Sequence, residues 1–253
     1  MNENNLEIQR RLENEARFHD VSFTTDLRQK ADKYYSIVTN SRDYYSKLIN
    51  ENIKGKKCLE YGCGTGSYGF GLAKEGADVT GIDISPIAIE VAKEIADKQG
   101  LNNQTEFLVM NAEDLKFPDE TFDLICGTGI IHHLNLEKSF SEIKRVLKKN
   151  GKAVFSEPLG HNPIINWYRN RTPEMRTEDE HPLLIKDIEF AKKYFKKVDV
   201  KYFHILSLAT VPFRNTFLFK PLYFLTELID KVLMTIIPPL KSWAWMCNIE
   251  LSK

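Results

Sequence analysis

Short apolar runs alternate with helical periodicities through most of the chain. Compact β-rich runs occupy residues 57–61, 77–83, 105–110, 121–126 and 152–156, and helical patterns follow most of them. One helix begins at Ser85-Pro86, an N-cap residue followed by proline at the first helical position. Ile87, Val91 and Ile95 recur four residues apart and mark its expected inner face. Strands that alternate with helices predict a parallel, doubly wound α/β sheet with right-handed crossovers.

The second half of the chain departs from this rhythm. Residues 158–182 are a long polar connection, which in a compact domain predicts a lid or binding loop. A helix over 184–195 and a strand over 198–206 are expected next. Apolar residues at every second position from Trp243 to Leu251 predict one more strand.

Between these last two strands lies an unusually apolar insertion, residues 209–241. Residues 217–237 within it are expected to form an amphipathic helix. Its apolar side would consist of Leu218, Leu222, Leu225, Ile229, Val232 and Ile236. Three hypotheses compete for this segment: it covers a substrate pocket, pairs with a second copy in a homodimer, or makes peripheral contact with a membrane.

Composition narrows the class of protein. The 253 residues suit one large α/β domain, and the 35 basic and 35 acidic side chains cancel, which argues against a nucleic-acid partner. The four cysteines show neither a C-x-x-C pair nor a zinc-ligand spacing, so no metal site is expected. Residues 1–17 lack the apolar stretch of a signal peptide, and no segment has the uncharged length of a membrane span, which favours a cytoplasmic location.

A glycine-rich loop follows the first strand and opens a helix, the usual setting of a ligand loop in α/β proteins. Gly64, Gly66 and Gly69 also satisfy the spacing of the dinucleotide fingerprint, and Asp83 lies at a suitable distance to hold a ribose. A Walker-type phosphate loop is excluded, because no Gly-Lys-Ser/Thr follows. Glycine spacing alone therefore leaves a nicotinamide enzyme open.

Later segments resemble those of another family. Segments 59–66 (LEYGCGTG), 81–85 (GIDIS), 111–118 (NAEDLKFP), 122–126 (FDLIC) with 131–134 (IHHL), and 146–152 (VLKKNGK) carry this resemblance in order. Together they resemble class I S-adenosylmethionine-dependent methyltransferases of the type 11-like small-molecule branch. The resemblance implies a Rossmann-like mixed seven-stranded sheet, with helices on both faces and the last strand antiparallel. The chain contains no Tyr-x-x-x-Lys, which weighs against hydride transfer.

The resemblance also implies a cofactor site for S-adenosyl-L-methionine. The residues expected to hold its methionine part are Glu60, Gly62, Gly64 and Gly66. Asp83 would bind the ribose, and Ile84 would pack on the adenine. Ala112 would offer its backbone N–H to the adenine ring, while the side chain of Asn111 or Glu113 would meet the exocyclic amine. The family usually has Asp at the position of Asn111, but an amide oxygen can accept the same hydrogen bond.

Candidate catalytic groups lie in loops that follow the fourth and fifth strands, where open α/β folds bind their ligands. His132 and His133 follow the fourth strand, and Glu157 and His161 follow the fifth. Each could accept a proton from a nucleophile, although each could equally only shape its loop. A base is useful for an alcohol nucleophile and optional for an amine.

The sequence thus predicts a single methyltransferase domain over 1–253. It divides into an N-terminal helical cap (1–52), a cofactor-binding core (53–157) and a substrate-side half (158–253). We expect methyl transfer to an O or N nucleophile of a small or amphiphilic molecule. The alternatives are a membrane-associated lipid or quinone methyltransferase, an NAD-dependent oxidoreductase, and a cofactor-binding protein without catalysis. Gly127-Thr128-Gly129 replaces the Asn/Asp-Pro-Pro-aromatic motif of DNA amino-methyltransferases, which again argues against nucleic acid.

Overall fold

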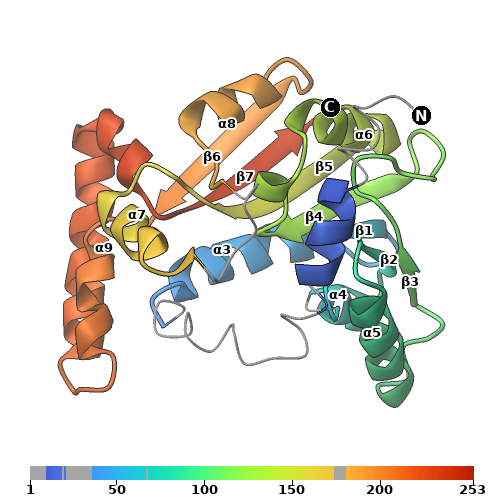
Figure 1. Ribbon diagram of the computed structural model, residues 1–253, viewed down its shortest axis with the longest axis horizontal. Helices are drawn as coiled ribbons and strands as arrows, with labels where there is room; N and C mark the ends of the chain where they lie inside the picture. The colour runs from blue at the N-terminus through green and yellow to red at the C-terminus, as the bar shows by residue number, and fades with distance from the viewer. Residues whose placement is uncertain (1–9, 19, 21–35, 67, 174–180) are drawn as a thin grey trace.

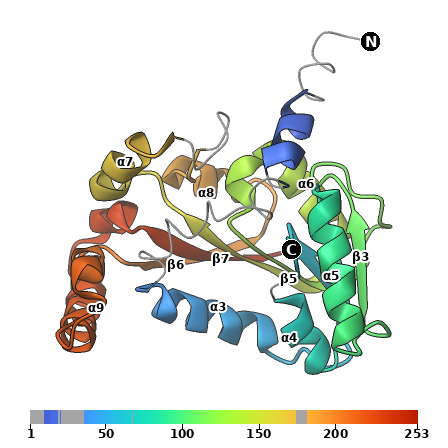
Figure 2. The same cartoon turned by 60° about the horizontal axis from the view of Figure 1, so that its bottom comes forward.

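The computed structural model describes residues 10–18, 20, 36–66, 68–173 and 181–253. Its centre is a seven-stranded sheet with helices on both faces (Figures 1 and 2). The strands are β1 (Lys57–Tyr61), β2 (Asp78–Asp83), β3 (Thr105–Val109), β4 (Phe122–Thr128), β5 (Leu147–Pro158), β6 (Lys197–Phe203) and β7 (Met246–Ser252). Besides a helical stretch over residues 10–18, the α-helices are α3 (Thr39–Asn50), α4 (Gly69–Lys74), α5 (Pro86–Lys98), α6 (Leu136–Val146), α7 (Pro163–Asn170), α8 (Ile185–Ala191) and α9 (Phe219–Ile236).

The strand order in the sheet is β3-β2-β1-β4-β5-β7-β6. Strands β1 to β5 pair in parallel, and β7 runs antiparallel between β5 and β6. The mixed, Rossmann-like sheet predicted from the sequence is therefore confirmed. The chain reverses its direction of winding between β1 and β4, and a crevice beyond the carboxyl ends of these strands is the usual ligand site of such sheets.

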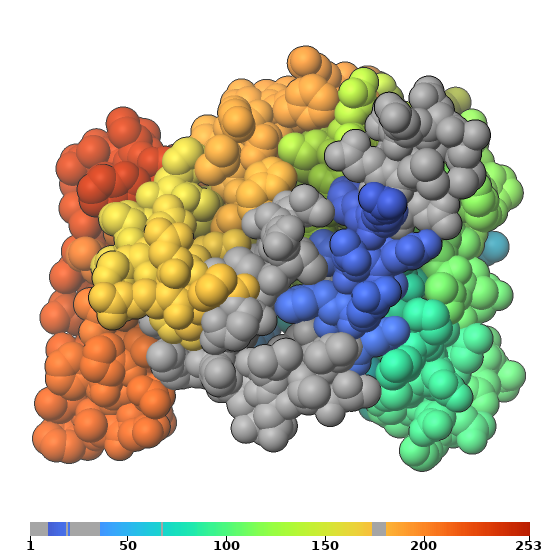
Figure 3. Space-filling model, in the orientation of Figure 1, coloured from blue at the N-terminus to red at the C-terminus, as the bar shows by residue number. Residues whose placement is uncertain are grey.

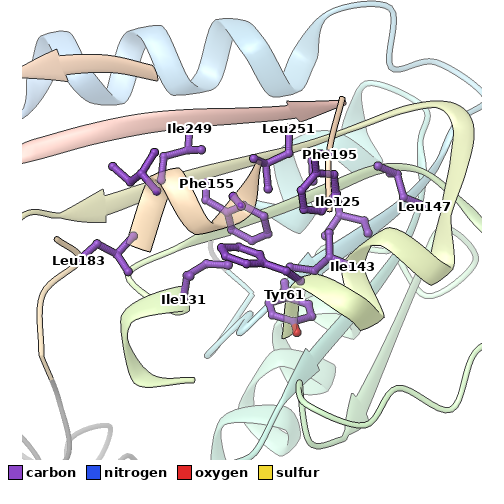
Figure 4. Packing of buried hydrophobic residues seen from close by; sticks show 14 of the residues in the cluster. Tyr61, Ile125, Ile131, Ile143, Leu147, Phe155, Leu183, Phe195, Ile249 and Leu251 are labelled. Carbon is purple, nitrogen blue, oxygen red and sulfur yellow. The ribbon is translucent and has the colours of Figure 1, made fainter. Parts of the chain in front are cut away.

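Helices α3, α4 and α5 pack on one face of the sheet, while α6 and α8 pack on the other (Figure 2). Figure 4 shows the core between the sheet and helices α6 and α8, where Tyr61 and Phe155 of the sheet lie in one cluster with Ile143 of α6. Burying side chains of this size is the main favourable term in folding.

The expected inner face of α5 is only partly right. Ile95 packs against the core, but Ile87 is exposed, and the buried residues are Ala88, Ile89, Ala92 and Ala96. The buried face is thus rotated from the expected one, and its alanines allow the helix to approach the sheet closely. The expected N-cap is confirmed, because the Ser85 hydroxyl accepts a hydrogen bond from Ala88 N at 3.0 Å.

The connection over 158–182 is not a plain loop, because it contains α7. The Asn162 side chain caps this helix by accepting hydrogen bonds from Ile164 N and Ile165 N at 2.9 and 3.1 Å. Leu159 and Leu183 form an isolated bridge, so the connection begins and ends at the same place. Residues 174–180 of the expected lid lie outside the described residues.

The long helix expected in the apolar insertion is confirmed as α9, but the side that faces the protein is not the predicted apolar side: it combines acidic residues with the partly buried Tyr223 and Met234. Asp230 is the buried residue of this helix, whereas Leu218, Leu225, Ile229, Val232 and Ile236 on the predicted apolar side are exposed. Within the described residues, no helix is both long and apolar enough to cross a membrane.

Candidate functional site

The glycine loop after β1 has a backbone that only glycine adopts easily. Gly62, Gly64 and Gly66 have φ angles of 69°, 51° and 86°. A Cβ atom at Gly62 would lie 2.7 Å from Cγ1 of Ile130, so the loop also needs the space that glycine leaves. The loop therefore passes close under the segment that follows β4.

Glu60 fixes the end of this loop. Its carboxylate oxygens accept hydrogen bonds from Tyr68 N and Gly69 N, both at 2.9 Å, and its side chain is buried. These bonds satisfy two backbone donors at the start of α4. Glu60 thus shapes the loop from behind.

Asp83, at the end of β2, joins two loops. Its Oδ2 atom accepts a hydrogen bond from Gly64 N at 2.7 Å, and Oδ1 accepts one from Ser85 N at 2.9 Å. Each carboxylate oxygen has a second lone pair, so the group can still accept hydrogen bonds from a ligand. The carboxylate lies at the carboxyl edge of the sheet, beside the glycine loop.

The turn after β3 brings a second carboxylate to the same edge. Asn111 Oδ1 accepts a hydrogen bond from Glu113 N at 2.9 Å, so the amide shapes the turn. Glu113 Oε1 accepts one from Asn135 N at 2.8 Å and also pairs with the Arg11 guanidinium. Glu113 Oε2 is buried at 4.0 Å from Lys138 Nζ and accepts no hydrogen bond from the described residues. A buried acceptor with this vacancy is suited to a donor from a ligand.

These loops enclose a cavity of about 180 Å³. The cofactor residues expected from the sequence that line it are Gly62, Gly64, Asp83, Ile84, Asn111, Ala112 and Glu113. Glu60 and Gly66, expected to touch the cofactor, are not among its lining residues. Cys63 also lines the cavity, and burial raises the pKa of its thiol far above the ordinary value, so this thiol stays uncharged.

Of the four candidate catalytic residues, His133 lines the cavity. Its Nδ1 atom lies 3.0 Å from Glu15 Oε1. His132 instead turns into the protein, where its Nδ1 atom lies 2.7 Å from Glu157 Oε2. His161 lies elsewhere, on the surface, and accepts a hydrogen bond from Ile185 N at 3.2 Å.

Glu157 is fully buried at the end of β5. Its Oε1 atom accepts hydrogen bonds from Ile130 N and Ile131 N at 2.9 and 3.0 Å, while Oε2 meets His132. Glu157 therefore holds the segment that follows β4, and with it the neighbouring His133, in place.

Sequence reasoning missed the contribution of residues 10–18, which are helical and carry Arg11, Leu12 and Glu15 into the cavity wall. Arg11 pairs with Glu113 and its Nη1 atom donates to the carbonyl oxygen of His133 at 3.4 Å. The available signal was the four-residue spacing of Arg11 and Glu15, which places both on one helix face. Figure 3 shows these residues in blue over the front of the molecule.

Residues 59–155 match a family model described as a methyltransferase domain. Residues 59–155 thus have the sequence of a methyltransferase domain. The match contains the glycine loop, Asp83 and the turn at Glu113, so the resemblance inferred from these motifs is confirmed for this part of the chain. The match favours S-adenosylmethionine over a nicotinamide cofactor.

Two curated relatives illustrate the extent of the similarity. The chain is 35% identical over 137 residues to sterol 24-C-methyltransferase ERG6A of Gibberella zeae, which covers 53% of this chain and 34% of the relative. It is 34% identical over 118 residues to the mitochondrial ubiquinone biosynthesis O-methyltransferase of Schizosaccharomyces pombe, covering 45% of this chain and 43% of the relative. The chain thus spans less than half the length of either relative.

Solved structures share the fold over a larger part of the chain. One is phosphoethanolamine N-methyltransferase 2 of Haemonchus contortus, solved with S-adenosylhomocysteine. The match covers 82% of this chain and 52% of that protein's chain, with a TM-score of 0.61 and 21% identity. Another is the [4+2]-cyclase SpnF, where the match covers 83% of this chain and 80% of the cyclase chain, with a TM-score of 0.56 and 18% identity. At this identity the likeness concerns the fold alone, and a named cyclase is among the proteins that have it.

The residues of the cavity fit the cofactor of the family. The glycine loop leaves room for close backbone approach, Asp83 presents a carboxylate, and Glu113 has an oxygen without a hydrogen bond. Ile84 and Met110 add apolar surface to the same cavity, as an adenine ring requires. The donor and acceptor set is thus that of a nucleoside site.

Proposed function

We propose that this chain transfers the methyl group of S-adenosylmethionine to an O or N nucleophile of a small or amphiphilic molecule. One observation carries the proposal: a single cavity at the carboxyl edge of β1, β2 and β4 unites the glycine loop, Asp83 and the Glu113 turn. When bound, S-adenosylmethionine supplies an electrophilic methyl group on a sulfonium. Positioning a nucleophile against such a group accounts for much of the rate in well-oriented systems.

The cavity residues divide the cofactor between them in this proposal. Gly62 and Gly64 give the methionine part access to the backbone, and Asp83 accepts hydrogen bonds from the ribose hydroxyls. Ile84 packs on the adenine, and Glu113 Oε2 accepts from its exocyclic amine. The helical residues 10–18 cover the cavity and help to exclude water.

We propose His133 as the group that accepts the proton of a hydroxyl nucleophile. Its ring lies in the cavity wall, and the Glu15 carboxylate 3.0 Å from Nδ1 favours the tautomer with hydrogen on that nitrogen. The other ring nitrogen, Nε2, is then the proton acceptor. Glu157 acts as a positioning residue, because it holds the backbone before His133.

The relatives and the composition of the chain both bear on which molecule accepts the methyl group. Proteins named for sterol and ubiquinone methylation are among the relatives, which supports an amphiphilic acceptor and keeps a lipid or quinone as a candidate. Zero net charge supports a small molecule rather than a nucleic acid. Four free, buried cysteines support a reducing, cytoplasmic location.

Calorimetry with S-adenosylmethionine and with NADH tests the cofactor. We expect binding of S-adenosylmethionine and at least about a tenfold loss of affinity in Asp83→Ala, since a hydrogen bond to a charged group contributes about 1.5–3 kcal/mol. Asp78→Ala is the matched control, because Asp78 lies exposed at the opposite end of the same strand. Binding of NADH alone, or equal affinities in the two variants, would refute the assignment.

Turnover separates an enzyme from a cofactor-binding protein. The chain is incubated with S-adenosylmethionine and a lipid-containing metabolite extract, and S-adenosylhomocysteine is quantified together with mass increases of one methyl group. We expect product that depends on both the extract and the wild-type cavity. Tight binding of S-adenosylmethionine without turnover in any extract would indicate a non-methylating use of the fold, as in the named cyclase.

A further inference from the structure

Helix α9 is attached to the molecule through its polar side. Asp230 is 1% exposed, and its carboxylate accepts hydrogen bonds from the three successive backbone N–H groups of residues 205–207 at 2.8–3.2 Å. Glu227 Oε1 lies 2.9 Å from His204 Nδ1, and Asn40 donates to Glu227 Oε2 at 2.7 Å. Both acidic groups of the helix are therefore engaged with the protein.

The opposite side of α9 presents apolar side chains to the surface. Phe224 is 73% exposed and Leu228 is 53% exposed. Pro221, Phe224, Leu228 and Val232 recur every three or four residues and so lie along one side of the helix. The other exposed large apolar residues of this segment are Phe213, Phe217, Leu218, Leu225, Ile229, Ile236 and Ile237. Figures 1 and 3 show α9, in orange, along one flank of the molecule.

The charges that α9 and its flanking residues expose have one sign. Residues 211–243, all of them described, contain four cationic side chains, and each of these is exposed: Arg214, Lys220, Lys231 and Lys241. The acidic residues of the stretch, Glu227 and Asp230, are the two that turn inward. Lys220 and Lys231 are about three helical turns apart and border the same side of the apolar face. The exposed surface of this segment is therefore more positive than its composition of two acids and four bases indicates.

We propose that the outward face of α9 docks onto an anionic lipid bilayer surface. An apolar helix face bordered by lysines is the form taken by helices that lie in the bilayer interface. A second copy of the chain is a poorer occupant, because a twofold axis would oppose the same four cations to one another. None of the described residues that line the cofactor cavity comes from 209–241, so this face is not the wall of that site.

The neighbouring surface continues the same chemistry. Trp243, just beyond α9, is half exposed, and Trp167 of α7 is also exposed and lies under the Arg171 guanidinium at 4.2 Å. Tryptophan side chains favour the boundary between headgroups and acyl chains. Helices α7 and α9 contribute to one apolar cluster: Ile165 of α7 belongs to it, and Phe219 and Tyr223 of α9 pack against it. Docking goes beyond methyl transfer and does not depend on which molecule is methylated.

Vesicle co-sedimentation tests the proposal on the full chain. Vesicles of phosphatidylcholine with phosphatidylglycerol are compared with vesicles of phosphatidylcholine alone. We expect partitioning at least about tenfold stronger on the anionic vesicles, since each cation near such a surface contributes about fivefold. Phe224→Ser with Leu228→Ser should weaken binding about tenfold per side chain. Lys220→Glu with Lys231→Glu should abolish the preference for anionic lipid, and added salt should weaken it.

Matched controls lie at the far side of the sheet. Val109→Ser removes an exposed apolar residue of β3, and Lys98→Glu reverses an exposed charge of α5. Both should bind vesicles as the wild type does, and all variants should keep its melting temperature and affinity for S-adenosylmethionine. Absence of vesicle binding by the wild type, equal binding to both lipids, or a dimer that Phe224→Ser dissociates would each overturn the proposal. If neither the wild type nor any variant bound S-adenosylmethionine, that result would count against the proposed function and not against membrane docking.

Discussion

Replacing Asp230 with alanine tests the orientation of α9. The side chain is buried, and it is the acceptor for Ile205 N and Ser207 N at 3.0 and 3.2 Å and for Leu206 N at 2.8 Å. Alanine leaves all three donors without this acceptor. Two of the three bonds lie in buried surroundings and the one to Leu206 is partly accessible, so water can replace only part of what is lost.

The expected cost follows from these three bonds. An unsatisfied buried donor costs about 1–3 kcal/mol, and a donor that water can reach costs less. Two buried donors at about 1.5–2 kcal/mol each and one accessible donor at about 0.5–1 kcal/mol give a loss of about 3.5–5 kcal/mol. For a chain of this size, that loss lowers the melting temperature by about 10 °C.

Urea unfolding followed by circular dichroism measures the change. Asp119→Ala is the control, because Asp119 is 75% exposed and its ion pair with Arg145 at 2.9 Å should contribute below about 1 kcal/mol. Asp230→Asn keeps one acceptor oxygen and should fall between the wild type and Asp230→Ala. A loss below about 1 kcal/mol in Asp230→Ala would show that α9 is not held by its polar side.

Three further predictions concern the site, acid stability and the thiols. His133→Asn should lower kcat about a hundredfold and remove the acidic limb of the pH–rate profile, with little change in cofactor affinity; an unchanged profile would contradict the assigned role. Arg145 lowers the pKa of Glu142 by hydrogen bonding, against the opposing effect of burial. This stabilisation is complete above the ordinary carboxyl pKa and is lost as pH falls through the lowered value, so urea midpoints should decline less steeply with acid in Glu142→Gln. An identical decline would contradict this. Burial raises the pKa of Cys58 to about 12, and the other cysteines are buried too, so a disulfide reagent at pH 8 should label thiols only after unfolding.

Local patterns predicted most of the strands well because these are short apolar runs between turn residues. Strand β5 is longer than the expected 152–156, because it begins at Leu147 and includes polar residues. The period-two pattern from Trp243 to Leu251 indicated β7, although the strand begins at Met246. Hydrophobicity did not fully predict which faces of α5 and α9 turn inward. On α5 three alanines are buried together with Ile89, and on α9 Asp230 meets backbone donors that no periodicity reveals.

The motifs predicted most of the cavity wall because they are local in sequence. They did not separate residues that touch the cavity from Glu60, which satisfies backbone donors behind it. They also predicted the same catalytic role for His132 and His133, whereas the contact with Glu157 turns His132 inward. Arg11 reaches Glu113 from 102 residues away, and such a contact depends on the folded arrangement of segments.

The attachment of α9 has a consequence for how this molecule can vary. Because the helix is held by its inward side chains, among them Asp230, Glu227 and Tyr223, its most exposed outward side chains contribute little to the packing of the core. Exchanging Leu228 or Phe224 changes the character of the surface and leaves the core contacts intact. Surface chemistry and conformational stability are thus independent variables in this segment, so its outer side can be adapted to a new environment without loss of the fold.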